Sequence, residues 1–443
     1  MKRLYQTFLA TMTLTAGLHA EGFRTDINPA LLYYQAFMTA QNVNQADSDY
    51  LTTNSWRGQF TPDKPGAIVH VLDLLPEKVG TSLSAYDSEF KLLRQAAQCR
   101  VPADWGLDMS AGPELLLPHL SRAKHASQIV RLRLQWALQN GHPAEGRDDV
   151  LATLALSRNL AHDGVLISAL VQVAMENILL NVLAENYYRI PSKTWQDLAA
   201  GFTAAPPRGT MEAAIAGGEK QCFYGWFERK IKAAKQANAG NEKAAVAAIR
   251  EIFINIGGGG DATSETPTAQ ADRIIQAAGG TSDGVLRLLE PMPALYDEAA
   301  AVMRLPAPEY ESAMAAFMKK IKEMPNPLVS EFFPALEKCR RKEIVAEVKL
   351  AMLQAAAAYR SQGEAGLATV ADPGGKGPFQ FQKFQFEGRE RGFRLTSAYR
   401  QLGTDGANGF AITLIFDEKG GNPFFVDGPH AGEAVIKPAG NSR

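Results

Sequence analysis

The chain has 443 residues, 46% of them hydrophobic, which is enough for several domains with substantial cores. Its 46 Lys and Arg residues nearly balance its 47 Asp and Glu residues, so the formal net charge is −1. With this balance the protein has no net electrostatic field that would attract nucleic acid or an anionic membrane. Neither is expected as a partner.

The first residues have the pattern of a secretory signal peptide. Lys2 and Arg3 precede a mildly apolar run that ends at Leu18, and Ala20 is a small residue at the expected cleavage site. This order of basic, apolar and small residues predicts residues 1–20 as a signal peptide. The mature protein is therefore expected to be periplasmic or secreted, with no transmembrane segment.

Helical periodicity dominates residues 21–256, which are predicted to form a helical bundle. Residues 121–161 divide at Gly141-His142-Pro143 into two segments with apolar stripes. Glycine ends a helix and proline begins one, so the pattern predicts two antiparallel helices joined by a short turn. Such a hairpin is similar to one unit of a tetratricopeptide (TPR)-like array, whose period is ~34 residues. The region is therefore predicted to be a TPR-like or α-solenoid bundle.

The segment from Asp163 to Glu185 is apolar nearly all round, with Glu176 as the one charge between its ends. About 20 apolar residues suffice to cross a bilayer. However, a charged side chain at the bilayer centre costs ~2.5–3.5 kcal/mol, and Ser168 and Gln172 continue a polar stripe with Glu176. The segment is therefore interpreted as the central helix of a soluble bundle.

The C-terminal part of the chain changes character. A Gly run at 257–260 begins a predicted flexible linker or loop over residues 257–284, and a helical segment is expected over 285–333. Residues 334–443 are predicted to form a small α+β module, with one long helix and an antiparallel sheet. Alternating patterns and Gly-rich turns place its strands at 379–386, 392–399, 410–416 and 434–437. The fold class is thus mainly α, with a small C-terminal α+β module.

Three motifs in this module occur in a fixed order. Asp372-Pro373-Gly374-Gly375 follows the long helix, Leu395-Thr396-Ser397 lies in a strand, and Gly403-Thr404-Asp405-Gly406-Ala407-Asn408-Gly409 forms a turn. In these motifs the module resembles the C-terminal half of type II secretion pseudopilins, the major pseudopilin in particular. The resemblance implies the fold of the module and a calcium ion near the turn. The methylated membrane helix of those proteins is missing here, so the resemblance implies a fold more than a role in a filament.

A wider resemblance covers most of the chain. A signal peptide is followed by Trp105-Gly106-Leu107-Asp108, by Leu117-Pro118-His119-Leu120, by a helical repeat region and by the pseudopilin-like tail. In this order of segments the chain is similar to an uncharacterised family of exported bacterial proteins. The resemblance implies an architecture and no chemistry.

Polar residues in the helical part are candidates for a binding site. These residues are Asp104, Trp105, Asp108, His119, Arg131, Arg158 and Glu176. A carboxylate inside an apolar helix has a raised pKa unless a cation holds its charge, and arginines on the neighbouring helices can supply that cation. An internal ion pair that fixes helix register is favoured over catalysis for Glu176. The histidines lack the close spacing of a zinc site.

The Gly-rich turn near the C-terminus is the candidate metal site. Asp405 and Asn408 offer oxygen ligands on a tight turn, and Asp417 or Asp427 is a candidate third ligand. Such ligands suit calcium, although a turn rich in Gly, Asp and Asn also forms without an ion. No other cofactor is expected.

Binding is favoured over catalysis, because no nucleophile or phosphate-binding motif is present and helical arrays offer concave faces to partners. We expect an exported helical scaffold that binds a peptide or protein partner in the cell envelope. Two alternatives stay open. One is a periplasmic hydrolase or calcium-dependent enzyme that uses the acidic loop around Asp104 and Asp108, and the other is a structural component of a secretion or surface assembly.

Overall fold

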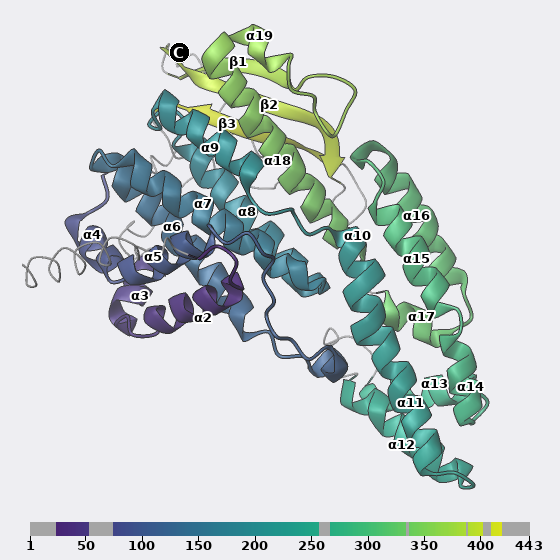
Figure 1. The fold of residues 1–443 in the computed structure, drawn as a ribbon. Coiled ribbons are helices and arrows are strands. Elements are labelled where there is room, and N and C mark those ends of the chain that lie inside the picture. Colours follow the sequence, from purple (N-terminus) through teal and green to yellow (C-terminus); the bar gives the residue numbers. More distant parts are fainter. Residues whose placement is uncertain are drawn as a thin grey trace, which may run out of the picture.

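The computed structural model describes residues 24–52, 74–256, 266–333, 336–386, 389–401 and 409–418. Over these residues the protein is mainly α-helical, with a small antiparallel sheet near the C-terminus, which confirms the predicted fold class (Figure 1). The predicted signal peptide, the candidate calcium ligands Asp405, Asn408 and Asp427, and the strand expected at 434–437 lie outside the described residues.

The helices up to the centre of the chain are α2 (Pro29–Ala40), α3 (Gln45–Thr52), α4 (Glu77–Ser84), α5 (Asp87–Ala96), the 3-10 helix η2 (Met109–Glu114), α6 (Pro118–Gln139), α7 (Pro143–Leu160), the 3-10 helix η3 (Ala161–Asp163), α8 (Leu166–Glu185) and α9 (Ser192–Ala204). Those after it are α10 (Met211–Ala214), the π-helix η4 (Ile215–Tyr224), α11 (Gly225–Ala237), α12 (Glu242–Ile256), α13 (Pro267–Ala277), α14 (Ser282–Leu289), α15 (Met292–Met303), α16 (Ala307–Glu323), α17 (Pro327–Phe332), α18 (Leu336–Gln362) and α19 (Glu364–Leu367).

The predicted hairpin of two long helices is present as α6 and α7, which pack against each other. The turn between them contains Gly141 at φ +77°, a left-handed conformation that glycine adopts without steric cost. Pro118 and Pro143 each occupy the first position of their helix, where the missing N–H removes no hydrogen bond. Local signals in the sequence therefore set the ends of both helices.

Helix α8 has a central place, with α2–α7 on one side of it and α10–α17 on the other (Figure 1). Of the described helices it alone is long and apolar enough to cross a membrane, but it packs against α6, α7 and α18. Its polar residues Ser168, Gln172 and Glu176 are all buried. In this fold α8 is packed as a core helix, because an apolar helix needs neighbours on all its sides.

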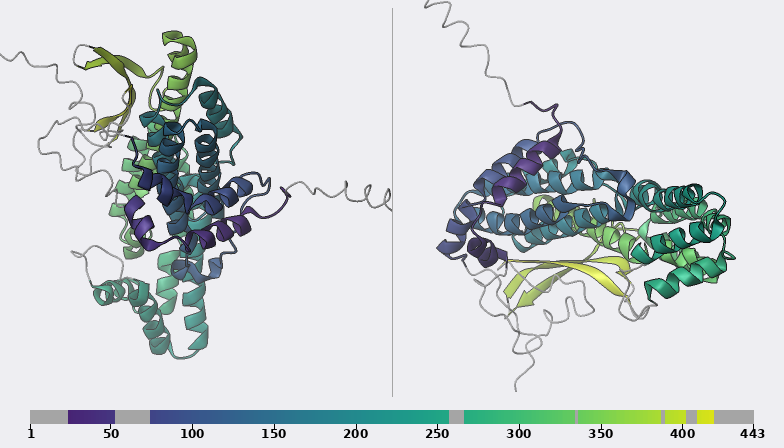
Figure 2. Two further views of the ribbon diagram at one scale, coloured as in Figure 1. Left: turned by 90° about the vertical axis from the view of Figure 1, so that its left-hand side faces the viewer. Right: turned by 90° about the horizontal axis from the view of Figure 1, so that it is seen from below.

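The C-terminal sheet has three antiparallel strands in the order β1 (Gln380–Phe386), β2 (Arg389–Gln401) and β3 (Phe410–Asp417). It covers one face of the helices, with α18 alongside it (Figure 2). Tyr187, just after α8, contacts the rings of Phe393 and Phe416 in the sheet, and its hydroxyl donates to the carbonyl of Ala356 in α18 at 2.8 Å. The α+β module is therefore packed on the helical body as well as on its own long helix.

The prediction of a flexible linker is wrong for residues 266–284, which form α13 and the beginning of α14. The Thr266 side chain accepts a hydrogen bond from the backbone of Ala269, and Pro267 follows at the first helical position. This cap begins a helix whose Ala271 and Ile274 are buried. The Gly run at 257–260 lies outside the described residues.

Candidate functional site

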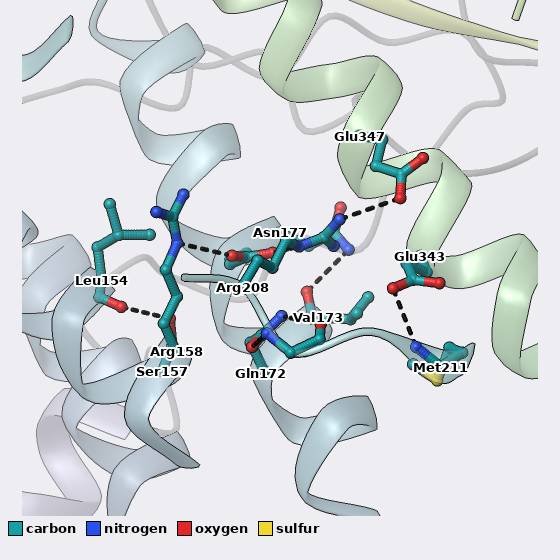
Figure 3. Close-up of polar contacts among 12 residues, drawn as sticks. Leu154, Ser157, Arg158, Gln172, Val173, Asn177, Arg208, Met211, Glu343 and Glu347 are labelled. Atoms are coloured by element: carbon teal, nitrogen blue, oxygen red, sulfur yellow. Dashed lines mark hydrogen bonds and ion pairs between the residues drawn. The ribbon is translucent and has the colours of Figure 1, made fainter. Parts of the chain in front are cut away.

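Buried Glu176 lies in a chain of ion pairs with Arg158 and Arg208. Figure 3 labels these two arginines and the residues around them. Its carboxylate accepts hydrogen bonds from Arg208 Nε at 2.7 Å and from Arg158 Nε at 3.4 Å. Arg158 also donates to the carbonyl oxygens of Phe202 and Pro206, at 3.3 and 3.0 Å. Arg158 therefore connects α7 to α8 and to the segment that follows α9.

The chain of ion pairs continues from Arg208 to α18 (Figure 3). Arg208 Nη1 donates to Glu347 at 3.3 Å, and Arg340 Nη1 donates to both Glu347 and Glu343 at 2.7 Å. Glu343 accepts the backbone N–H of Met211 at 3.1 Å, and burial raises the pKa of this carboxyl against the opposing charge of Arg340. These contacts fix the relative positions of α7, α8, α10 and α18, as expected of an ion pair that sets helix register.

Gln172 positions the loop that carries Arg208. Its side-chain amide donates to the carbonyl of Gly209 at 3.1 Å and accepts the N–H of Gly209 at 2.9 Å. A Cβ at Gly209 would lie 2.4 Å from the Cβ of Ala161, so only glycine fits this contact. The polar stripe of α8 thus serves the packing of its neighbours.

Trp105 and His119, two of the candidate binding residues, stack on each other. Their ring centroids are 4.4 Å apart, and Tyr33 also stacks on the indole, with centroids 5.6 Å apart. The Trp105 Nε1 donates to the carbonyl of Asn159 at 2.9 Å. His119 is 1% exposed, its ring nitrogens have no hydrogen bond with any described residue, and burial lowers its pKa to about 4. His119 is therefore a neutral packing residue at physiological pH.

The two aspartates of the acidic loop hold local turns. Asp104 accepts the N–H of Gly106 at 2.9 Å, and Asp108 accepts the N–H and hydroxyl of Ser110 at 2.9 and 2.6 Å. The bonds from Ser110 lower the pKa of the Asp108 carboxyl. Both aspartates are exposed, in contrast to buried Glu176.

The other candidate residues have separate partners. Arg131 pairs with Glu185, at 2.9 and 3.0 Å, and not with Glu176. Asp417 accepts two hydrogen bonds from Arg391, at 3.0 and 2.5 Å. Among the described residues, no group of three or more His, Cys, Asp or Glu side chains is placed to hold a metal ion.

Sequence reasoning missed a polar cavity of about 520 Å³ formed by α2, α3, α5, α6 and the residues that follow α2. The residues that line it are Ala40, Gln41, Val43, Gln45, Ser48, Tyr86, Glu89, Ser121, Arg122 and His125. The side chains of Gln41, Ser121 and Arg122 are exposed, so the cavity opens to solvent.

Glu89 is the unusual member of this lining. It is 1% exposed, and neither carboxyl oxygen has a hydrogen bond with any described residue. Burial raises its pKa to about 8, although Arg133 and Arg122 act in the opposite direction. An unpaired, buried carboxyl next to a cavity is a typical functional-site candidate.

Tyr86 and His125 lie beside Glu89 in the lining. The Tyr86 hydroxyl is 3.2 Å from His125 Nε2, and the histidine tautomer decides which of the two donates. Burial lowers the pKa of His125, and Arg122 adds to this effect. At neutral pH the imidazole is therefore uncharged, and Arg122 is the lining residue with a fixed positive charge.

A local signal for Glu89 is present in the sequence. Tyr86, Glu89, Phe90 and Leu93 are all buried, and their spacing is that of one helix face. A glutamate on an otherwise apolar face was the available clue. Whether this glutamate has a partner depends on α6, which lies more than twenty residues further along the chain. The local sequence therefore does not show that Glu89 is unpaired.

Compared with known proteins, the chain matches no family model, no curated protein and no solved structure. The resemblances to type II secretion pseudopilins and to a family of exported bacterial proteins therefore stay predictions.

Proposed function

We propose that this protein is an exported helical scaffold that binds a peptide or protein partner in the cell envelope. The observation that carries the proposal is the solvent-open polar cavity between α2, α3, α5 and α6. Its volume of about 520 Å³ lies in the range of ordinary ligand pockets, and it can take a few residues of an extended peptide.

The roles of the other polar residues support binding over catalysis. Glu176 is occupied by Arg158 and Arg208, and the acidic-loop residues Asp104 and Asp108 hold backbone turns. These contacts stabilise the frame on which the cavity is built. A rigid frame lowers the entropic cost of binding, because fewer groups must be ordered when the partner arrives.

The proposal is tested by crosslinking the purified chain to partners in envelope extract. The variant Gln41→Trp places a large ring at the exposed rim of the cavity, while Gln128→Trp places the same ring on an exposed position of α6 outside the lining. We expect Gln41→Trp to lose the crosslinked partner and Gln128→Trp to keep it. Equal capture by both variants contradicts the proposal. If both variants also capture envelope machinery as the wild type does, a structural role in an assembly is favoured.

A further inference from the structure

The polar groups that line the cavity include one fixed positive charge and an exposed side-chain amide. Arg122 carries the positive charge and Gln41 has an exposed side-chain amide. The Ser121 hydroxyl already donates to the carbonyl of Pro118 at 3.1 Å, and the Gln45 amide donates to Asp49 at 2.8 Å. Arg122 makes no ion pair or hydrogen bond with any residue that the structure describes. The lining therefore presents a cation and the neutral amide of Gln41 to a ligand that enters.

Glu89 adds a further donor when it carries its proton. A carboxylate with two unpaired oxygens is costly at 1% exposure, because burial without hydrogen bonds removes its hydration. Protonation removes the charge and leaves one O–H group. Enzyme active sites use the same arrangement, in which an apolar site keeps a carboxylic acid neutral and the acid donates a hydrogen bond.

The charged groups on the elements packed around Glu89 include two arginines, Arg122 and Arg133, that oppose its protonation, but the effect of burial is larger. From α6 come Arg122, His125 and Arg133, and from α7 comes Asp149, which accepts a hydrogen bond from Arg133 at 2.7 Å. On its own helix, Tyr86, Asp87 and Arg94 lie nearby, and Asp87 accepts from Arg133 at 2.8 Å. From α3 comes Asp47, which accepts from Ser82 of α4 at 2.7 Å, and α2 brings Tyr33 and Tyr34. Arg133 is thus matched by two aspartates, and Arg122 is not.

We propose that the cavity binds a carboxylate group of the partner, with Arg122 as its ion-pair partner and the protonated Glu89 side chain as a hydrogen-bond donor. This inference rests on the proposed function, because it names the chemical group by which a peptide or protein partner is recognised. An Asp or Glu side chain in an exposed segment of the partner supplies such a group.

The charge of the lining decides between ligand classes. An ammonium or guanidinium group would meet Arg122 and a neutral Glu89, so it would gain no ion pair. A phosphate dianion calls for more than the one unmatched arginine that the lining offers. A carboxylate needs one cation and one or two neutral donors, which Arg122, the Gln41 amide and the protonated Glu89 supply.

The test is a calorimetric titration of the full chain with two blocked residues, N-acetylglutamate methylamide and N-acetylglutamine methylamide. They differ only in the carboxylate. A blocked pentapeptide with a central Glu or Gln provides the peptide arm, and glutarate and inorganic phosphate provide small anions. We expect binding of the Glu forms only, with phosphate weaker than the carboxylates. Arg122→Ala should weaken binding of the Glu forms roughly tenfold to a hundredfold, as loss of a charge-assisted hydrogen bond predicts.

The role of Glu89 has its own readout. Because the pKa of Glu89 is about 8 in the unliganded protein and a bound anion raises it further, wild-type affinity should fall by about tenfold in total between pH 7 and pH 9. Glu89→Gln keeps a neutral donor, so its affinity should stay within about threefold of the wild type at pH 7 and should not fall at pH 9. The pKa of His125 is lowered, so the imidazole does not titrate in this range.

The outcomes separate the inference from the proposed function. Equal binding of the Glu and Gln pentapeptides overturns the carboxylate inference and leaves the peptide-binding function in place. Binding of glutarate without binding of either pentapeptide supports the carboxylate site and argues against a peptide partner. An Arg122→Ala variant that binds as tightly as the wild type, or wild-type affinity that is constant from pH 7 to pH 9, overturns the inference.

Discussion

Replacement of Glu89 by Gln should stabilise the protein at neutral pH. The pKa of Glu89 is about 8 in the folded protein and 4.5 is its ordinary value, so between these values the unfolded chain gives up a proton that the folded chain keeps. The contribution of this group to stability is complete below pH 4.5 and is lost as the pH rises toward 8. At pH 7 the loss amounts to about 3 kcal/mol, from about 2.5 pH units at 1.36 kcal/mol each. Gln has a similar shape and no charge to lose.

The assay is chemical denaturation of wild type and Glu89→Gln at pH 4.5 and pH 7. The two proteins should have nearly equal free energies of unfolding at pH 4.5, and the variant should be more stable by about 3 kcal/mol at pH 7. Glu185→Gln is the matched control, because this buried glutamate pairs with Arg131 and its replacement should destabilise the protein by roughly 1–3 kcal/mol. A difference between wild type and Glu89→Gln that does not change with pH would refute the reasoning, as would a variant that is less stable at pH 7.

Three further predictions concern the frame. Glu176→Leu should lower the free energy of unfolding by ~3–5 kcal/mol in denaturant titrations, because Arg158 stays buried without its anion and Arg208 keeps only Glu347. His119→Phe keeps a ring on Trp105 and removes a base whose pKa is lowered to about 4, so the variant should gain up to about 2 kcal/mol over wild type at pH 5 and nothing at pH 8. Gly209→Ala should lower the melting temperature, since its methyl group would lie 2.4 Å from a neighbouring side-chain carbon, and overpacking of this kind costs ~1–3 kcal/mol.

The sequence predicts the elements whose signals are local. The stop at Gly141 and the start at Pro143 place the hairpin of α6 and α7, and apolar residues all round α8 identify a core helix. The period-two alternation of residues 379–386 identifies β1. The linker prediction failed because it extended the composition of a Gly run over Thr266, whose cap begins α13.

The ion pairs of Glu176 required information that the sequence does not carry locally. An arginine on the preceding helix was an expected partner, and Arg158 takes that role. Arg208 lies 32 residues after Glu176 in a loop between helices, and Glu347 lies 139 residues after Arg208. Helical periodicity assigns a face to each residue within one element. It does not say which elements pack together, so these contacts appear only in the folded structure.

Two buried glutamates of this protein differ in what surrounds them, and that difference gives them different roles. Glu176 has two arginines, and its charge is used to hold helices in place. Glu89 has no hydrogen-bond partner among the described residues and borders an open cavity, so its desolvation is not offset in the unliganded protein. A ligand whose carboxylate accepts the Glu89 O–H recovers part of that unfavourable free energy as affinity, because the buried polar group gains the hydrogen bond that it lacks. Of the two buried glutamates, Glu89 is for this reason the one at which a carboxylate ligand gains a hydrogen bond.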